Sequence, residues 1–288
     1  FMKRAICLCA SKSRKGNSQR IDNLIRHRLN KVFDVFEFVK IGDINKTIDN
    51  LSILINGYDY LIICGGDGTF NHIVNALARI DKKPILGYIN TGTICDCGYS
   101  FGVNGSINKA LKIIENQYTG RFDLIKIGDK YFTYMGAIGA FSSISYQTSR
   151  IALRIIGRLA YYLKALKFVF KKNKVTYSLT INGINYDGTS PFILLLNGNR
   201  VGGFKINKNS SSQDGYFEVY LTKNGIFNGL LSYFVFPKIK PIKTNKVIIN
   251  SLSSSAWCLD GEQYELSSNV IEIDKNKLEV LCKKPFSK

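Results

Sequence analysis

A strand, a glycine-rich turn and a helix follow one another without a gap early in the chain. Residues 60–64 form an apolar run typical of a buried strand, residues 65–69 read Gly-Gly-Asp-Gly-Thr, and residues 70–80 show helical periodicity. Because glycine lacks a Cβ, backbone N–H groups in such a turn can approach phosphate oxygens, and the helix N-terminus adds a favourable dipole. Thr69 is the expected N-cap. The segment predicts a phosphate-binding turn, with a tight turn selected for its turn chemistry alone as the alternative.

Asp67 is the most informative residue of this turn. A carboxylate beside a phosphate repels it unless Mg²⁺ or a donated hydrogen bond bridges the two groups. We therefore expect Asp67 to act through a metal ion. The chain has no G-x-x-x-x-G-K-[ST] pattern, because Phe204 separates Gly203 from Lys205, and it has no H-R-D or D-F-G set. P-loop enzymes and protein kinases are thereby excluded.

The hydrophobic pattern predicts an α/β domain over residues 1–120. Strand-like and helical runs alternate there, which is the rhythm of an open α/β sheet with right-handed crossovers. The expected strands cover residues 4–10, 32–39, 60–64 and 84–89, and the expected helices cover residues 19–30, 44–55, 70–80 and 106–116.

From about residue 121 to residue 277 the chain predicts an antiparallel β-sandwich, because β-rich segments alternate with hairpin turns such as Gly128-Asp129 and Asn182-Gly183. The expected strands cover residues 122–127, 131–137, 175–181, 192–196, 216–221, 246–250 and 270–273. A final strand near residues 278–282 could return to the first domain, so the tail 278–288 is expected to pack there.

The charge balance favours anionic partners. Lys and Arg number 40 against 21 Asp and Glu, which gives a net charge of +19. Such a field attracts nucleic acid, acidic lipid surfaces or phosphorylated small molecules. No helix-turn-helix, zinc-finger or RNP-type signature accompanies it, so a nucleic-acid partner is not expected.

Compartment and redox state follow from simpler features. The 7 cysteines form no C-x-x-C pair and are expected to be reduced thiols. No apolar run approaches the roughly 20 residues of a membrane-spanning helix, and the apolar run near the N-terminus is too short for a secretory signal. These features predict a cytoplasmic protein.

A basic helix is expected at residues 151–170, within the β-rich part. Its apolar residues recur at helical spacing beside Arg154, Arg158 and Lys164. It serves either as a solvated basic face over the sandwich or as a helix that contacts an anionic lipid surface. The sequence leaves both interpretations open.

Residues 65–71 resemble the nucleotide loop of the diacylglycerol kinase catalytic family, which includes bacterial lipid kinases and sphingosine and ceramide kinases. The five-residue turn alone is shared with NAD kinases. Further elements that resemble the family follow in the family's order: Thr91-Gly92-Thr93 with Asp96, Arg121-Phe122-Asp123, Gly202-Gly203 with Asp214-Gly215, and Asp260-Gly261-Glu262. The resemblance spans about residues 60–265 and implies an α/β nucleotide-binding domain joined to a β-sandwich lipid-substrate domain, with the active site between them.

The resemblance also implies roles for individual residues. Asp67 would organise a catalytic Mg²⁺ through a network with Asp96 and Asp123, and Glu262 would be the general base. A separate structural Mg²⁺ would be held by Asp214 with main-chain carbonyls near Ser211 and Tyr216. The remaining residues implied in cofactor binding are Gly65, Gly66, Gly68, Thr69, Thr93, Asp96 and Asp123.

The sequence departs from the family pattern at several positions. Residues 10–16 replace the usual asparagine-proline pair of the first nucleotide loop, where Lys12 or Arg14 could reach phosphate instead. The other departures are His72, Asn90, Cys95 and Cys97.

The resemblance thus implies an ATP-dependent lipid kinase that transfers the γ-phosphoryl group to the hydroxyl of diacylglycerol or a related lipid. Its expected partners are a lipid substrate at the membrane surface and anionic phospholipids, and a homodimer is compatible with the sequence. An NAD kinase-like enzyme and a non-catalytic nucleotide or lipid sensor of the same fold are the alternatives.

Overall fold

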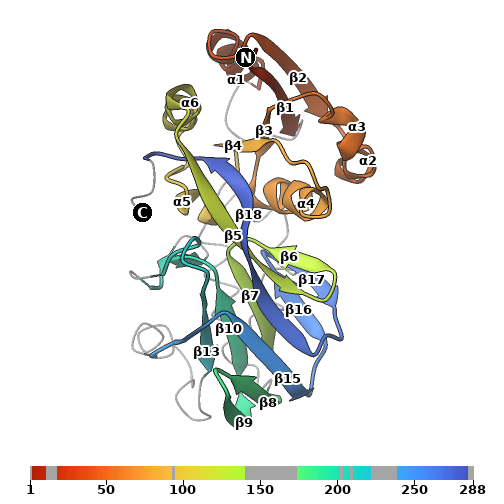
Figure 1. Cartoon of the computed structure of the whole chain (residues 1–288), viewed down its shortest axis with the longest axis vertical. Coiled ribbons are helices and arrows are strands. Elements are labelled where there is room, and N and C mark those ends of the chain that lie inside the picture. The colour runs from red at the N-terminus through yellow and green to blue at the C-terminus, as the bar shows by residue number, and fades with distance from the viewer. Residues whose placement is uncertain are drawn as a thin grey trace. The chain divides into compact units, whose positions relative to one another are not determined.

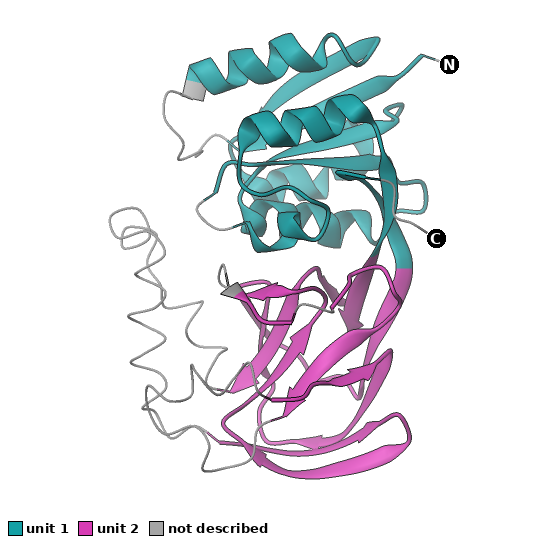
Figure 2. Ribbon diagram, turned by 90° about the vertical axis from the view of Figure 1, so that its left-hand side faces the viewer, with its two compact units in different colours: residues 1–122, 276–288 teal, residues 123–275 magenta. Residues whose placement is uncertain are grey.

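The computed structural model describes residues 2–10, 18–92, 95–139, 174–201, 204–207, 210–221 and 239–284. The chain divides into unit 1, residues 1–122 with 276–288, and unit 2, residues 123–275 (Figure 2). The expected basic helix at residues 151–170 and residues 11–16 of the first loop lie outside the described residues. No helix of the described residues is long and apolar enough to cross a membrane.

Unit 1 is built on a parallel sheet with the strand order β2-β1-β3-β4 (Figure 1). In β1, Ala5 to Leu8 are all buried, and β3 is buried from Leu61 onward. Such continuous apolar runs are typical of parallel strands that helices cover on both faces. The strands are β1 (Arg4–Ala10), β2 (Val35–Ile41), β3 (Tyr60–Gly65) and β4 (Ile85–Asn90), and the helices are α1 (Ser18–Leu29), α2 (Ile44–Asp49), α3 (Leu51–Leu54), α4 (Asp67–Leu77), α5 (Asp96–Tyr99) and α6 (Ile107–Asn116).

One expected helix is divided in two. The sequence predicts a single helix over residues 44–55, whereas α2 ends at Asp49 and α3 begins at Leu51. Asn50 between them leaves the helical region of backbone angles, and its side-chain amide donates to the carbonyl of Lys46 at 2.9 Å. Asparagine favours such local side-chain bonds over helix continuation, which explains the break.

Helix α4 buries one stripe of its surface. Phe70, Ile73, Val74 and Leu77 are fully buried at the i, i+3, i+4 and i+7 spacing of an amphipathic helix. The ring of Phe70 packs against Tyr88 of β4 at a centroid distance of 4.7 Å. This packing fixes the first turn of α4 relative to the end of the sheet.

Unit 2 is antiparallel. Among the described residues, a 6-stranded sheet has the order β14-β13-β10-β7-β16-β17, and β15 pairs antiparallel with β8 and with the start of β18. The fold therefore confirms the predicted class, an α/β part and an antiparallel β part. The strands are β5 (Thr119–Ile127), β6 (Lys130–Phe132), β7 (Met135–Gly139), β8 (Val175–Ile181), β9 (Ile184–Ser190), β10 (Phe192–Leu196), β11 (Arg200–Val201), β12 (Phe204–Lys205), β13 (Phe217–Leu221), β14 (Ile242–Thr244), β15 (Lys246–Leu252), β16 (Ala256–Leu259), β17 (Glu262–Glu265) and β18 (Val270–Leu281).

Strand β18 belongs to both units. The sequence predicts two separate strands near residues 270–273 and 278–282, but the structure has one strand of 12 residues. Polar residues around Asn276, which has a φ of 55°, resemble a turn in the sequence although pairing continues on both sides of it. Val270 pairs antiparallel with Ile248 of β15, and Val280 pairs parallel with Leu86 of β4.

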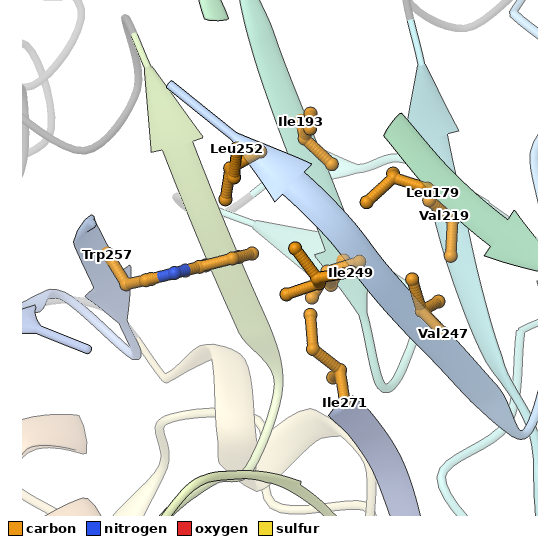
Figure 3. Close-up of a pocket in the computed structure, with 9 residues that line it drawn as sticks. Leu179, Ile193, Val219, Val247, Ile249, Leu252, Trp257 and Ile271 are labelled. Carbon is orange, nitrogen blue, oxygen red and sulfur yellow. The ribbon is translucent and has the colours of Figure 1, made fainter. Parts of the chain in front are cut away.

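Apolar side chains from the 6-stranded sheet and from strands β8, β15 and β18 form the core of unit 2. They enclose a cavity of about 10 Å³, which is room for one water molecule at most, and its lining is entirely apolar (Figure 3). It is a packing defect and is too small for a ligand. Its lining residues are Leu179, Ile193, Leu195, Val219, Val247, Ile249, Leu252, Trp257 and Ile271.

We predict that Ile249→Ala destabilises unit 2 by about 2 to 5 kcal/mol, because it enlarges this cavity and removes apolar burial. Ile248→Ala is the matched control, since Ile248 is the neighbouring residue of the same strand but is 41% exposed, against 8% for Ile249. Chemical denaturation of both variants checks the prediction. Equal losses would show that β15 does not pack as described.

Candidate functional site

The glycine turn connects β3 directly to α4. Gly65 ends the strand, and a Cβ placed on it would lie 2.7 Å from the Cβ of Thr69, so no other residue fits without displacing the first turn. Gly66 is the N-cap, in extended conformation, and the N–H of Phe70 donates to its carbonyl at 3.1 Å. The prediction that Thr69 is the N-cap is wrong, because α4 already begins at Asp67.

This start places Asp67 in the first turn of α4, where the helix dipole favours a negative charge. Backbone N–H groups at the start of a helix bind anions, as expected for a phosphate turn. The turn lies beside the segment that begins with Thr91-Gly92-Thr93, here named the second loop, since a Cβ on Gly66 would lie 3.5 Å from the Cα of Gly92. Thr93, the next residue of the second loop, lies outside the described residues.

Asp67 and Asp96 come together in unit 1. The backbone N–H of Asp96 donates to Oδ2 of Asp67 at 3.4 Å, and the thiol of Cys97 donates to Oδ1 at 2.8 Å. Asp96 opens the short helix α5 and is 2% exposed. The structure thus places the backbone of Asp96 against the carboxylate of Asp67, and their shared role in a metal network stays a prediction.

Asp123, the third, is the first residue of unit 2 and is fully buried. Its Oδ2 accepts the backbone N–H of Gly215 at 2.8 Å, and its own N–H donates to the carbonyl of Ser212 at 2.8 Å. These bonds attach the segment 211–216 to the middle of β5. The predicted participation of Asp123 in a metal network stays a prediction.

Asp214 already has a cationic partner. Its Oδ2 accepts from Lys243 Nζ at 2.7 Å, and its Oδ1 accepts the N–H of Tyr216 at 3.0 Å. Lys243 Nζ also lies 5.3 Å from the centre of the Tyr216 ring. Hydrogen bonding to Asp214 raises the pKa of Lys243.

This arrangement gives no support for a second Mg²⁺. The ammonium neutralises the carboxylate, Ser211 adds no carboxylate, and the described residues contain no group of three Asp, Glu, His or Cys side chains placed to hold a metal. The structural metal expected at Asp214, Ser211 and Tyr216 stays a prediction, and no step below depends on it.

Asp260 anchors the hairpin that carries Glu262. It is 4% exposed, and its Oδ2 accepts from the N–H and hydroxyl of Thr133, both at 2.6 Å. Its Oδ1 accepts the N–H groups of Tyr134 and Met135, each at 3.0 Å. Burial raises the pKa of Asp260, while the hydrogen bonds from Met135, Thr133 and Tyr134 oppose that rise.

The turn after Asp260 sets the position of Glu262. Asp260 and Gly261 both have positive φ, at 49° and 95°, as in the type I′ turns that join paired strands tightly. Glu262 therefore begins β17 directly opposite Leu259 of β16. The Asp-Gly pair is a hairpin turn and a buried anchor at once, so the structural and functional interpretations of this motif are compatible.

Asn197 links these motifs, although no sequence pattern pointed to it. Its side-chain N–H₂ donates to the carbonyls of Asp123 at 2.7 Å and Thr133 at 3.0 Å, and it is fully buried. Thr133 in turn binds Asp260. The Asp123 and Asp260 motifs thus share one buried polar network in unit 2, and the Asp214-Gly215 motif joins it through the bond from Gly215 to Asp123.

Glu218 is a second residue that the sequence did not indicate. It is 3% exposed on β13 and accepts from the hydroxyl of Ser210 at 2.5 Å. Burial raises the pKa of Glu218 to about 7, with the Ser210 hydrogen bond opposing the rise and the charge of Asp214 adding to it. Unit 2 therefore contains a carboxyl group that titrates near neutral pH.

Comparison with known proteins decides the family. The chain is 30% identical over 256 residues to "Diacylglycerol kinase" of Staphylococcus carnosus, covering 85% of this chain and 83% of that protein. The chain belongs to the diacylglycerol kinase family. The family's catalytic domain matches residues 4–127, which include Asp67, Asp96 and Asp123. The same-named protein of Staphylococcus aureus is 29% identical over 248 residues, covering 82% of this chain and 78% of that protein.

Solved structures of two chains from Bacillus anthracis share the fold. One, of a diacylglycerol kinase, gives a TM-score of 0.81 at 19% identity and covers 98% of this chain and 97% of that chain. The other gives a TM-score of 0.85 at 20% identity and covers 98% and 96%. The diacylglycerol kinase family membership confirms the resemblance seen in the sequence motifs.

We predict that Asp260→Ala destabilises the chain by about 3 to 5 kcal/mol, because it leaves four buried donors without their acceptor. Asp187→Ala is the control: Asp187 is exposed on β9, and its loss should change stability by less than about 0.5 kcal/mol. Urea denaturation of both variants makes the comparison. A stable Asp260→Ala protein would mean that the hairpin does not depend on this carboxylate.

We predict that Glu218 makes the free energy of unfolding fall between about pH 4.5 and pH 7. Its pKa rises from 4.5 to about 7 on folding, so the native state holds the proton more tightly and loses that advantage as pH rises through the folded value. Glu218→Gln removes this dependence and should gain about 1 to 3 kcal/mol relative to wild type between pH 5 and pH 8. Denaturation of both proteins across that range measures the difference. A constant difference would contradict the buried carboxyl.

Proposed function

We propose that this chain is an ATP-dependent lipid kinase that transfers the γ-phosphoryl group of ATP to the hydroxyl of diacylglycerol or a closely related lipid. The observation that carries the proposal is the glycine turn, which sets Asp67 in the first turn of α4 and against the N–H of Asp96. Membership of the diacylglycerol kinase family and relatives of that name support it.

The residues around Asp67 fit a nucleotide-bound Mg²⁺. This ion commonly takes one or two protein carboxylates and completes its shell with phosphate oxygens and water. Asp67 would supply one such carboxylate and Asp96, whose backbone N–H contacts Asp67, would supply the second, while the described residues contain no larger cluster that would hold a metal without a nucleotide. When bound, Mg²⁺ supplies neutralisation of the charge on the transferring group.

The chain's own residues perform the remaining work. N–H groups at the glycine turn would bind phosphate oxygens, and Asp67 would hold the metal that neutralises them. Glu262 accepts the proton of the lipid hydroxyl as its oxygen forms the new bond to phosphorus and the bond to the ADP oxygen breaks. Phosphoryl transfer passes through a loose transition state, so positioning and charge neutralisation account for most of the rate.

The acceptor is proposed to be presented at a membrane surface by a cytoplasmic, peripherally bound enzyme. The net charge of +19 supports this, since basic proteins are attracted to anionic lipid headgroups.

Transfer of label from [γ-³²P]ATP tests the function. Purified protein is incubated with diacylglycerol, a sphingoid base and a prenol in mixed micelles, with NAD as a soluble acceptor. We expect label in the lipid fraction, highest with diacylglycerol. Label in NAD alone would make the enzyme NAD kinase-like, and ATP binding without transfer to any acceptor would make the protein a non-catalytic sensor.

We predict that Glu262→Gln lowers turnover by about 10² to 10⁴, because it removes the base while keeping the side chain's size. ATP affinity and thermal stability should stay near wild type, since the residue is assigned to the acceptor hydroxyl. Glu265→Gln is the matched control, because Glu265 ends the same strand and is exposed. Loss of ATP binding in Glu262→Gln would assign the residue a different role.

A further inference from the structure

Cys97 is a buried thiol that contacts the central carboxylate of the proposed site. It lies in α5, is fully buried, and its Sγ is 2.8 Å from Oδ1 of Asp67. A thiol is a weak donor, but a hydrogen bond to a charged acceptor is among the stronger classes. Cys97 is therefore in a position to restrict the orientation of the Asp67 carboxylate.

A chain of contacts continues from Cys97 to the second loop. Burial raises the pKa of the Tyr88 hydroxyl, and the neighbouring Cys97 adds to that rise. That hydroxyl donates to Oδ1 of Asn90 at 3.0 Å, and the same oxygen accepts the N–H of Gly92 at 3.1 Å. Tyr88 is 2% exposed, so these bonds are shielded from water. The contacts join the first turn of α4 to the loop that begins at Thr91.

The chain of contacts uses two of the positions at which the sequence departs from the family pattern, Asn90 and Cys97. Each departure on its own removes a usual residue. In the structure Asn90 accepts a hydrogen bond from Tyr88, and Cys97, which neighbours the same tyrosine, donates one to Asp67. The two departures thus lie on either side of Tyr88.

We propose that Cys97 is a positioning residue, which holds the carboxylate of Asp67 in the orientation that the nucleotide-bound metal requires and couples it to the second loop. The proposal rests on the proposed function. Groups that orient a metal-binding carboxylate typically contribute about 10- to 100-fold to metal affinity or activity. Cys97 touches neither the nucleotide nor the acceptor in this scheme and acts only through Asp67.

The variants separate positioning from packing. Cys97→Ala removes the donor, whereas Cys97→Ser keeps a hydroxyl donor of similar size. Cys95→Ala is the matched control, because Cys95 is a buried thiol two residues away whose Sγ lies 3.5 Å from the carbonyl of Val103. A packing role alone would make the two Cys97 variants alike, and a donor role would make them differ.

Two measurements test the proposal: binding of a non-hydrolysable ATP analogue by calorimetry with and without Mg²⁺, and the Mg²⁺ concentration that gives half-maximal lipid phosphorylation. In Cys97→Ala we expect about 10- to 100-fold weaker Mg²⁺ activation and loss of most of the Mg²⁺-dependent gain in analogue binding, with metal-free binding unchanged. Cys97→Ser should recover most of both properties, and Cys95→Ala should match wild type.

The failures are distinguishable. If wild type binds the analogue in a Mg²⁺-dependent way and phosphorylates lipid, the proposed function stands, and the positioning role is overturned when Cys97→Ala matches wild type, loses metal-free binding as well, or behaves like Cys97→Ser. Should the alanine variant not fold, Cys97→Ser decides: Mg²⁺ activation near wild type supports the role, and a loss of about 10- to 100-fold overturns it. If wild type shows neither Mg²⁺-dependent binding nor turnover, the proposed function and the positioning role fall together.

Discussion

The close contact between Gly65 and Thr69 is the constraint on which the candidate site depends. A Cβ at Gly65 would lie 2.7 Å from the Thr69 side chain, so only glycine lets β3 pass into α4 without an intervening loop. That direct passage places Asp67 in the first turn of the helix. The buried rings of Phe70 and Tyr88 then hold the turn against β4. Local backbone sterics and aromatic packing together position the chemistry.

Unit 2 uses a different device, a buried polar network. Asn197 binds the carbonyls of Asp123 and Thr133, and Thr133 binds Asp260. Buried polar groups of this kind fix geometry because each unmade bond is costly in a low-dielectric interior. The network orders both the segment attached to Asp123 and the hairpin that begins β17. Each unit therefore positions its own acidic residues, unit 1 by backbone sterics and aromatic packing and unit 2 by buried hydrogen bonds.

Local patterns predicted the fold class and the glycine turn, because strand and helix periodicity and the steric freedom of glycine act over a few residues. The sequence misplaces the helix start at Thr69. The N-cap is the extended Gly66, and glycine is about as favourable as threonine at that position. Residues 270–281 were divided in two because polar residues around Asn276 imitate a turn. Asn197, Glu218 and the Cys97 contacts depend on long-range pairing and leave no local pattern. Thr93 and residues 202–203 lie outside the described part of the chain.

Strand β18 has a consequence for how the protein is made. Residues 276–281 belong to unit 1 and pair with β4, although 153 residues of unit 2, from 123 to 275, separate them from the rest of that unit. During synthesis the α/β unit therefore lacks its final strand until unit 2 has left the ribosome. A fragment that stops at residue 122 would expose the edge of β4, and such unpaired edges favour aggregation. The two units should therefore be expressed together in one chain.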